Sequence, residues 1–196
     1  FISTIANMLV IFGLVTYATK GVSFGAIEPT IPNMVIPKVN GFPTIILWAV
    51  AAIVIVWFIW NKTTFGKNLY AVGGNPEAAA VSGISVFAVT LGAFIMAGIL
   101  YGFGSWLECT RMVGSGSAAY GQGWDMDAIA ACVVGGVSFT GGIGKISGVV
   151  TGVLIFTSLT YSLTILGIDT NLQFIFEGII ILAAVTLDCL KYVQKK

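Results

Sequence analysis

Residues 44–60 read TIILWAVAAIVIVWFIW, an uninterrupted apolar run without a charged side chain. A helix needs about 20 apolar residues, within a range of about 17 to 25, to cross the hydrocarbon core of a bilayer. This run meets that length and predicts a transmembrane helix. Four further runs do the same, the last of them interrupted only by Glu177: residues 1–19, 87–107, 146–168 and 171–187.

The composition of the chain indicates that lipid is its main solvent. Of its 196 residues 57% are hydrophobic and 9% are charged, with a mean hydropathy of +0.99, whereas soluble domains contain about 25% charged residues. The net charge of +1 provides no field that would attract nucleic acid. Histidine is absent and the three cysteines lie far apart in sequence, so we expect no metal site, no redox motif and no cofactor.

One uncharged stretch, residues 128–144 (AIAACVVGGVSFTGGIG), is too rich in glycine over its second half for an ordinary span. We predict a short, broken or re-entrant helix there, with a complete crossing as the alternative. All five prolines lie outside the apolar runs, as expected because proline breaks helices. The sequence thus predicts an all-α polytopic membrane protein with five to six transmembrane or re-entrant helices, folded as a single domain over residues 1–196.

The spacing of glycines predicts how these helices pack, and the positions of basic residues predict how the chain is oriented in the membrane. Gly98 and Gly102 form one GxxxG pair, and Gly144, Gly148 and Gly152 form a doubled pair, a pattern that lets neighbouring helices approach closely. Basic residues in short loops favour the cytoplasm. With the C-terminus cytoplasmic, six of them lie inside, namely Lys62, Lys67, Lys145, Lys191, Lys195 and Lys196. Three then lie outside, namely Lys20, Lys38 and Arg111.

Residues 61–85 (NKTTFGKNLYAVGGNPEAAAVSGIS) form a polar connection that we predict to be cytoplasmic and to contain a short helix of about two turns. Asn75 is suited to cap the helix, and Pro76 to its first position. Glu77 suits the positive end of the helix dipole, and Gly83 can end the helix. The predicted site comprises Gly74, Asn75, Pro76, Glu77, Ala78, Ala79 and Gly83. A short helix of such small residues is suited to binding in a groove on another protein. The alternative is that the helix only links two transmembrane spans.

Other polar residues carry weaker signals. Asp125 and Asp127 have a spacing found in calcium loops, but the remaining ligands are missing, so we predict that Asp127 caps the helix that follows. Glu108 and Arg111 are close enough in sequence to pair at the external end of their helix. The segment GGIGK at residues 141–145 lacks the other residues of a phosphate-binding loop. We therefore expect that this chain does not bind ATP.

The segments YAVGGNPEAAAVSGIS (residues 70–85) and DAIAACVVGGVSFTGGIGKISGVVTGVLIF (residues 127–156) resemble the ribose, xylose and galactoside permeases of bacterial ATP-binding-cassette importers. WNKTTFGKNLYAVGGNPEAAAVSG (residues 60–83) and the ending LDCLKYVQKK (residues 187–196) are most similar to the galactose/methyl-galactoside branch. The likeness covers nearly the whole chain. Because family permeases are longer, it implies that this is the C-terminal portion and that further spans precede Phe1.

The resemblance implies a permease homodimer in the cytoplasmic membrane that takes up a monosaccharide, with an extracytoplasmic sugar-binding protein on one side and ATPase subunits on the other. The permease itself would not be an enzyme, because its partner hydrolyses ATP. Carried over to this chain, the helix at about residues 75–82 would be the coupling helix that docks on the ATPase. Ala80 stands where family members often have a basic residue, which could weaken one contact with the ATPase.

Two questions stay open at the level of sequence. Glu177 lies well inside a predicted span, where ionisable residues are costly and often functional. We expect a structural or interfacial role near the outer surface, with contact to the sugar path as the alternative. An ion-coupled secondary sugar transporter or channel is the other functional hypothesis, although the inverted repeats and paired broken helices typical of such proteins are not evident here.

Overall fold

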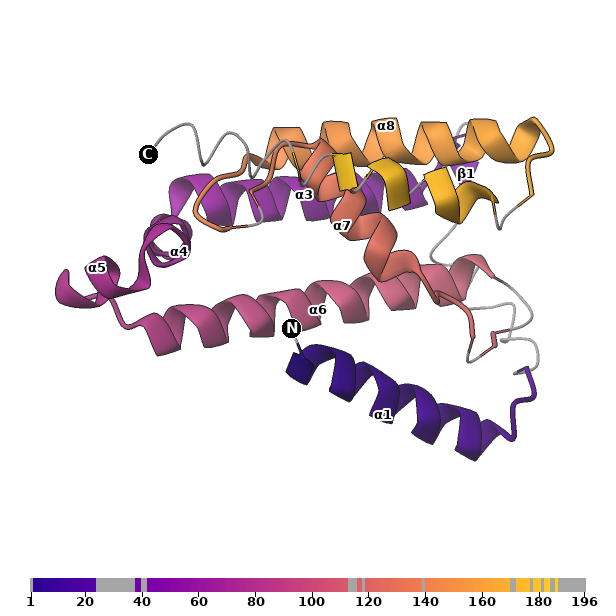
Figure 1. Ribbon diagram of the computed structural model, residues 1–196, viewed down its shortest axis with the longest axis horizontal. Coiled ribbons are helices and arrows are strands. Elements are labelled where there is room, and N and C mark those ends of the chain that lie inside the picture. The colour runs from indigo at the N-terminus through magenta and orange to yellow at the C-terminus, as the bar shows by residue number, and fades with distance from the viewer. Residues whose placement is uncertain are drawn as a thin grey trace. The chain divides into compact units, whose positions relative to one another are not determined.

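The structure is a computed structural model, shown as a ribbon in Figure 1. It describes residues 2–23, 38–39, 42–112, 116–117, 119–138, 140–169, 172–176, 178–180, 182–183 and 186. Glu177 and residues 187–196 lie outside the described residues, as do several positions of the predicted span 171–187. The chain divides into two compact units, Phe1–Ala52 with Ile95–Gln122 and Ile53–Phe94 with Gly123–Lys196.

Four helices of the described chain are long and apolar enough to cross a membrane. They are α1 (Ile2–Thr19), α3 (Ile45–Lys62), α6 (Val86–Arg111) and α8 (Ile146–Ile165). Each begins within two residues of a predicted span, so these four predictions are confirmed. No residue of α1 or α3 is buried within the described chain, as expected for apolar helices that face lipid.

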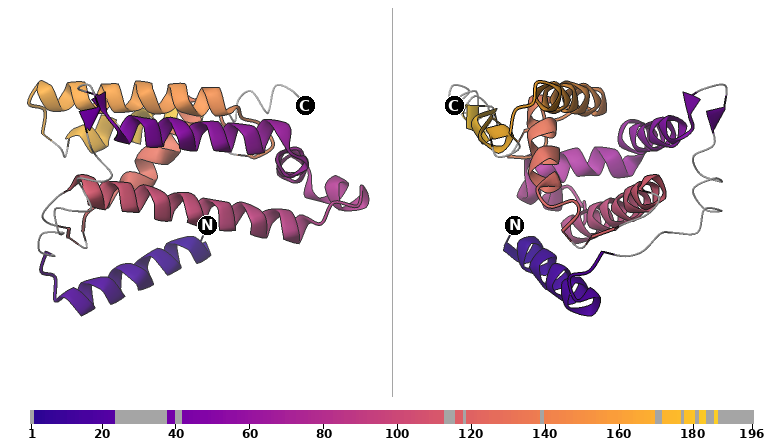
Figure 2. Two further views of the ribbon diagram at one scale, coloured as in Figure 1. Left: turned by 180° about the vertical axis from the view of Figure 1, so that it is seen from behind. Right: turned by 90° about the vertical axis from the view of Figure 1, so that its right-hand side faces the viewer.

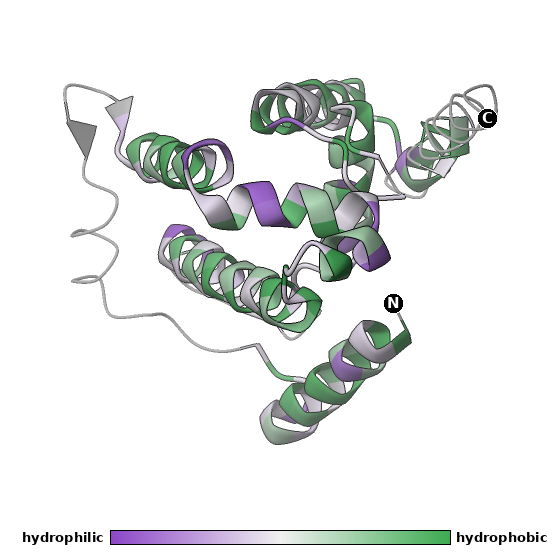
Figure 3. Cartoon of the chain, turned by 90° about the vertical axis from the view of Figure 1, so that its left-hand side faces the viewer, coloured by the Kyte–Doolittle hydropathy of each residue, from purple (hydrophilic) through white to green (hydrophobic). Residues whose placement is uncertain are grey.

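Three shorter helices are α4 (Thr64–Gly74), α5 (Pro76–Val81) and α7 (Trp124–Val134), and residues 172–176 and 178–180 are also helical. Two strands of two residues each, β1 (Lys38–Val39) and β2 (Phe42–Pro43), pair antiparallel before α3. The all-α, polytopic fold predicted from the sequence is confirmed. Figure 3 shows that the long helices are mostly hydrophobic along their length, whereas α4 carries hydrophilic turns.

The helix predicted within residues 128–144 exists, but it begins earlier than expected. Helix α7 starts at Trp124, with Gly123 as its N-cap at φ 90° and without a side-chain cap. Asp125 and Asp127 both lie in the first turn, so the predicted capping by Asp127 is wrong. Gly123, whose positive φ suits glycine, begins the helix ahead of the aspartates, and the two carboxylates instead lie near the positive end of the helix dipole.

Helices α7 and α8 pack closely at glycines, and Phe156 of α8 is buried in one hydrophobic cluster with Ala130 and Ala131 of α7. A Cβ added to Gly152 would lie 2.1 Å from the Ala131 carbonyl oxygen, and one added to Gly148 would lie 2.2 Å from the Gly135 oxygen. The predicted close approach at these glycines is therefore confirmed. Figure 2 shows α7 running obliquely to α8. Added Cβ atoms at Gly98 and Gly102 meet nothing within 4 Å, so no close approach forms there among the described residues.

Candidate functional site: the α4–α5 connection

Helix α5 begins at the cap predicted for it. The Asn75 side chain accepts a hydrogen bond from the Ala78 backbone N–H at 3.0 Å, and Pro76 occupies the first turn beside Glu77. Proline suits this position because its missing N–H would have no partner inside the helix. The predicted helix of residues 75–82 therefore forms, with its helical residues at Pro76–Val81.

The C-terminal end of α5 closes as a Schellman-type turn. Gly83 has φ 81°, and its N–H donates to the Ala80 carbonyl at 3.0 Å. The Ile84 N–H reaches back to the Ala79 carbonyl at 3.0 Å, and the Ser82 hydroxyl donates to the Ala78 carbonyl at 2.8 Å. Only glycine adopts this backbone conformation without strain. Both ends of a six-residue helix are thus fixed by local bonds.

The surface of α5 is almost entirely unoccupied within this chain. Ala79 is its one buried residue, whereas Pro76, Glu77, Ala78 and Ala80 are exposed. Val81 is 91% exposed. Gly74, immediately before the helix, is also exposed, and an added Cβ there would meet nothing within 4 Å. All the residues of the predicted site thus come together on one short projecting element, although no partner is present to show what it contacts.

Helix α4 was not predicted, and it positions α5. The Thr63 hydroxyl caps α4 by accepting from the Gly66 N–H at 3.3 Å and also donates to the Ile59 carbonyl of α3 at 2.6 Å. A Cβ at Gly66 would lie 2.0 Å from the Trp60 carbonyl oxygen, so the corner between α3 and α4 is tight. Capping by Thr63 and apolar residues at 65, 69 and 72 were the sequence signals for this helix.

Asn75 joins the two short helices directly. It is the C-cap of α4, where its backbone N–H donates to the Ala71 carbonyl at 3.1 Å, and it is also the N-cap of α5. One residue with extended dihedrals, φ −155° and ψ 103°, thus turns the chain from one helix into the next. Because no flexible spacer separates them, the orientation of α5 is set by α4.

The C-terminal half of α4 contacts the loop that links α7 to α8. The described residues of this loop, 136–138 and 140–145, are here called the glycine loop. The Tyr70 hydroxyl donates to the Gly144 carbonyl at 2.8 Å. A Cβ on Gly73 would lie 2.7 Å from the Gly142 nitrogen, and one on Gly141 would lie 2.6 Å from the Gly73 oxygen. The two backbones therefore touch without side chains between them.

A cavity of about 330 Å³ lies beside this contact. Its lining is mainly apolar and comes largely from the glycine loop, with further residues from the C-terminal end of α3, from α4, from α7 and from the start of α8. It includes Trp60, Leu69, Tyr70, Ile143 and Val149. Exposed Lys145 is also part of the lining. The described residues contain no group of three or more histidine, cysteine, aspartate or glutamate side chains that could hold a metal ion.

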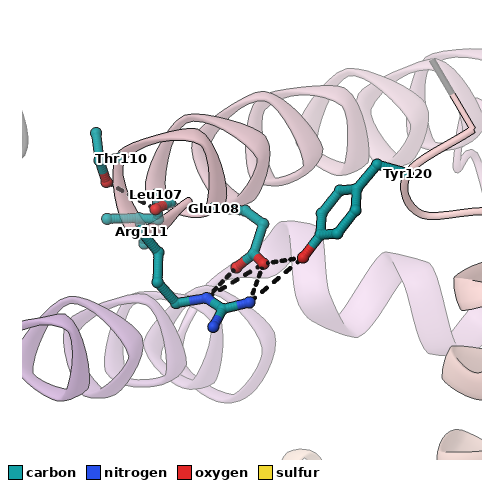
Figure 4. Close-up of polar contacts among 5 residues, drawn as sticks. All are labelled: Leu107, Glu108, Thr110, Arg111 and Tyr120. Atoms are coloured by element: carbon teal, nitrogen blue, oxygen red, sulfur yellow. Dashed lines mark hydrogen bonds and ion pairs between the residues drawn. The ribbon is translucent and has the colours of Figure 1, made fainter. Parts of the chain in front are cut away.

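Polar side chains at the other end of α6 form a small cluster (Figure 4). Arg111 pairs with Glu108, as the sequence predicted, and its Nε lies 3.0 Å from Glu108 Oε2. The Tyr120 hydroxyl donates to Glu108 Oε1 at 2.6 Å, and this bond to a carboxylate raises the pKa of Tyr120. Beside them, buried Thr110 donates its hydroxyl to the Leu107 carbonyl at 2.7 Å. Tyr120 was not predicted, because the contact spans a loop.

Aromatic rings lie near this cluster. Trp48, Phe103 and Trp106 contact one another with ring centroids 6.0 to 6.4 Å apart. At the other end of α3, the Lys62 ammonium lies 5.8 Å from the centroid of the Trp57 ring. Tryptophan gathers at membrane–water interfaces, where its ring is partly in apolar and partly in polar surroundings. Helix α3 therefore carries tryptophan near both of its ends, as expected for a transmembrane helix.

Apolar helices of spanning length, connected by a capped and exposed polar element, define the chain as a multi-pass membrane protein. The family model described as branched-chain amino acid transport system, permease component, matches residues 1–185. The chain belongs to this family. No solved structure matches the chain significantly.

Three individual relatives of the chain are sugar permeases. The chain is 54% identical over 205 residues to the galactose/methyl galactoside import permease protein of Treponema pallidum, with 100% of this chain and 38% of the relative covered. The same-named protein of Escherichia coli is 52% identical over 152 residues, covering 78% of this chain and 45% of the relative. The L-arabinose transport system permease of Escherichia coli is 36% identical over 194 residues, with 99% of this chain and 58% of the relative covered. The predicted resemblance to sugar permeases is confirmed, and the chain spans 38 to 58% of the length of these relatives.

Proposed function

We propose that the full-length protein is the permease subunit of an ATP-binding-cassette importer that carries galactose or methyl galactoside across the bacterial cytoplasmic membrane. The observation that carries the proposal is α5, a helix capped at both ends and exposed along all its residues except Ala79. A rigid, projecting rod of small residues fits a groove on a partner protein. The class of sugar is taken from the relatives, which are galactose/methyl galactoside import permeases.

In this account α5 is the coupling helix, and it docks on an ATPase subunit that hydrolyses ATP. Pre-formed caps favour docking because little conformational entropy remains to be lost on binding. A second permease copy would complete the translocation path, and a sugar-binding protein would deliver the substrate at the extracytoplasmic face. The Glu108, Arg111 and Tyr120 cluster is the polar group that the described chain offers to such a protein.

Basic residues support a cytoplasmic location for α5. Lys62 ends α3, Lys67 lies on α4, and Lys145 lines the cavity beside α4, so all three belong to one end of the second unit. Short cytoplasmic loops are enriched in lysine and arginine. This orientation places the C-terminus in the cytoplasm as well, provided that the last predicted span crosses once more.

If α5 is cytoplasmic, the segment that contains α7 has to cross the membrane. Helix α6 has 26 residues, about 39 Å at about 1.5 Å per residue, and it carries the chain away from α5 across the bilayer. The glycine loop nevertheless contacts α4, so the chain must return between α6 and α8. Helix α7 has 11 residues, about half the length that a full span needs. We infer a broken crossing, helical in its middle and irregular at its ends.

The test uses the full-length permease produced together with the candidate ATPase and binding protein. We expect Glu77→Lys and Gly83→Leu to reduce copurification of the ATPase while membrane insertion persists. Gly167→Leu is the matched control, because Gly167 has φ 71° and closes α8 with the same pair of bonds as Gly83 closes α5. Gly167→Leu should leave copurification unchanged.

Sugar uptake into proteoliposomes then tests the transport assignment. The proposal predicts uptake that requires ATP, the ATPase and the binding protein. Uptake driven by an ion gradient in the absence of ATP would identify a secondary transporter instead. Normal ATPase copurification with both α5 variants would refute the docking role of this helix.

A further inference from the structure

The contact between α4 and the glycine loop suggests how movement of α5 would reach the membrane helices. This inference rests on the proposed docking of α5 to an ATPase and extends it. We propose that α4 and the glycine loop move as one body, so that displacement of α5 is passed to α7 and α8, and that Tyr70 is a positioning residue of this connection.

The first step of the connection is covalent. Asn75 ends α4 and caps α5, with backbone and side-chain bonds to Ala71 and Ala78 at 3.1 and 3.0 Å. No residue between the two helices lacks a helical or capping bond. No flexible segment between the two helices could absorb a displacement of α5. Such a displacement must therefore rotate or translate α4.

The second step is the contact between two backbones that are distant in sequence. Gly73 meets Gly141 and Gly142, and a Cβ added to any of the three would lie within 2.7 Å of a backbone atom of the facing segment. Close-packed atoms have low compressibility and transmit displacement. Backbone atoms also lack the rotamer freedom by which a long side chain could absorb it. Gly141 at φ 94° and Gly142 at φ 70° shape the loop for this approach.

The third step is the hydrogen bond from Tyr70 to the Gly144 carbonyl, which joins residues 74 positions apart in sequence at 2.8 Å. The glycine contact resists compression, whereas this bond resists separation. The two contacts are of different kinds and act in opposite directions, so α4 can both push and pull the glycine loop. Tyr70 itself is only partly buried and therefore adds little to the packing of a core.

The final step leads into the membrane helices. The glycine loop starts directly after α7 and ends at Lys145, the N-cap of α8. It is closed on itself by the Ser138 N–H, which donates to the Ile143 carbonyl at 3.0 Å. Helices α7 and α8 are in turn held together at Gly135, Gly148 and Gly152. Movement of the loop must accordingly move both helices.

The experiment compares three variants of the full-length permease, each reconstituted with its ATPase and binding protein in proteoliposomes. Gly73→Ala inserts a methyl group between α4 and the glycine loop. Tyr70→Phe removes only the hydroxyl and keeps the ring, so it is expected to fold even where the glycine variant does not. Gly104→Ala is the control, because an added Cβ at Gly104 meets nothing within 4 Å.

We expect Gly73→Ala and Tyr70→Phe to keep ATPase copurification and ATP hydrolysis near the wild-type level, while the amount of sugar transported per ATP falls several-fold. Gly104→Ala should match the wild type in all three measurements. An unchanged ratio of sugar to ATP in both variants would overturn the inference. A parallel loss of copurification, hydrolysis and transport would also overturn it, because that result indicates a merely structural contact. If the wild-type permease binds no ATPase, the proposed function itself has failed.

Discussion

Removal of the α5 cap by Asn75→Ala tests how far docking depends on a pre-formed helix. The substitution deletes the 3.0 Å bond to the Ala78 N–H, and the loss of such a cap costs about 1 kcal/mol. A helix of six residues has little stability of its own, since isolated helices shorter than about 12 residues are marginal in water. Because about 1.4 kcal/mol corresponds to a tenfold change in an equilibrium constant, the dissociation constant for the ATPase should rise up to about five-fold.

The assay is a titration of the full-length permease in nanodiscs with the purified ATPase. Asn75→Ser is the matched variant, because serine caps helices about as well as asparagine, and its dissociation constant should stay close to that of the wild type. The reasoning is refuted if alanine at this position binds as tightly as asparagine. It is equally refuted if the serine variant loses as much affinity as the alanine variant.

Three further predictions concern stability, each measured by thermal unfolding of the full-length permease in detergent. Gly152→Ala should lower the free energy of unfolding by about 1 to 3 kcal/mol through overpacking, whereas Gly104→Ala should not; equal stability of the two would contradict the close approach of α7 and α8. Gln173→Leu should cost about 1 to 3 kcal/mol, since Gln173 is 6% exposed and donates to the Ile168 carbonyl at 3.0 Å; an unchanged unfolding temperature would contradict this bond. Arg111→Ala should cost less than about 1 kcal/mol, as expected for an exposed ion pair, and a larger loss would show that the pair is structural.

Sequence reasoning located the long helices because lipid imposes a simple requirement on them. A span must satisfy its backbone internally and present apolar side chains over about 20 residues, and both properties can be counted along the chain. The caps of α5 were also predictable, because Asn75 and Gly83 act on neighbours only three to five residues away. Local bonds of this kind are encoded in local sequence.

The features that escaped prediction depend on contacts between distant segments. The bond from Tyr70 to Gly144 crosses 74 positions, and no local pattern of apolar or polar residues encodes it. Gly148 and Gly152 of α8 predicted close packing, but not which helix would supply the partner. The start of α7 was misplaced because Gly123, with its positive φ, is the N-cap and lies four residues before Asp127, which was expected to cap the helix.

The account depends most directly on the position of α5 relative to the membrane, and side-specific labelling measures that position. In a cysteine-free, full-length permease expressed without its ATPase, Ala80→Cys places a thiol on an exposed position of α5, and Lys20→Cys places one just after α1 as the reference for the opposite side. The account predicts that a membrane-impermeant maleimide labels the Ala80 variant in inside-out vesicles only and the Lys20 variant in right-side-out vesicles only. Labelling of the Ala80 variant from the extracytoplasmic side, or from neither side, would contradict the account.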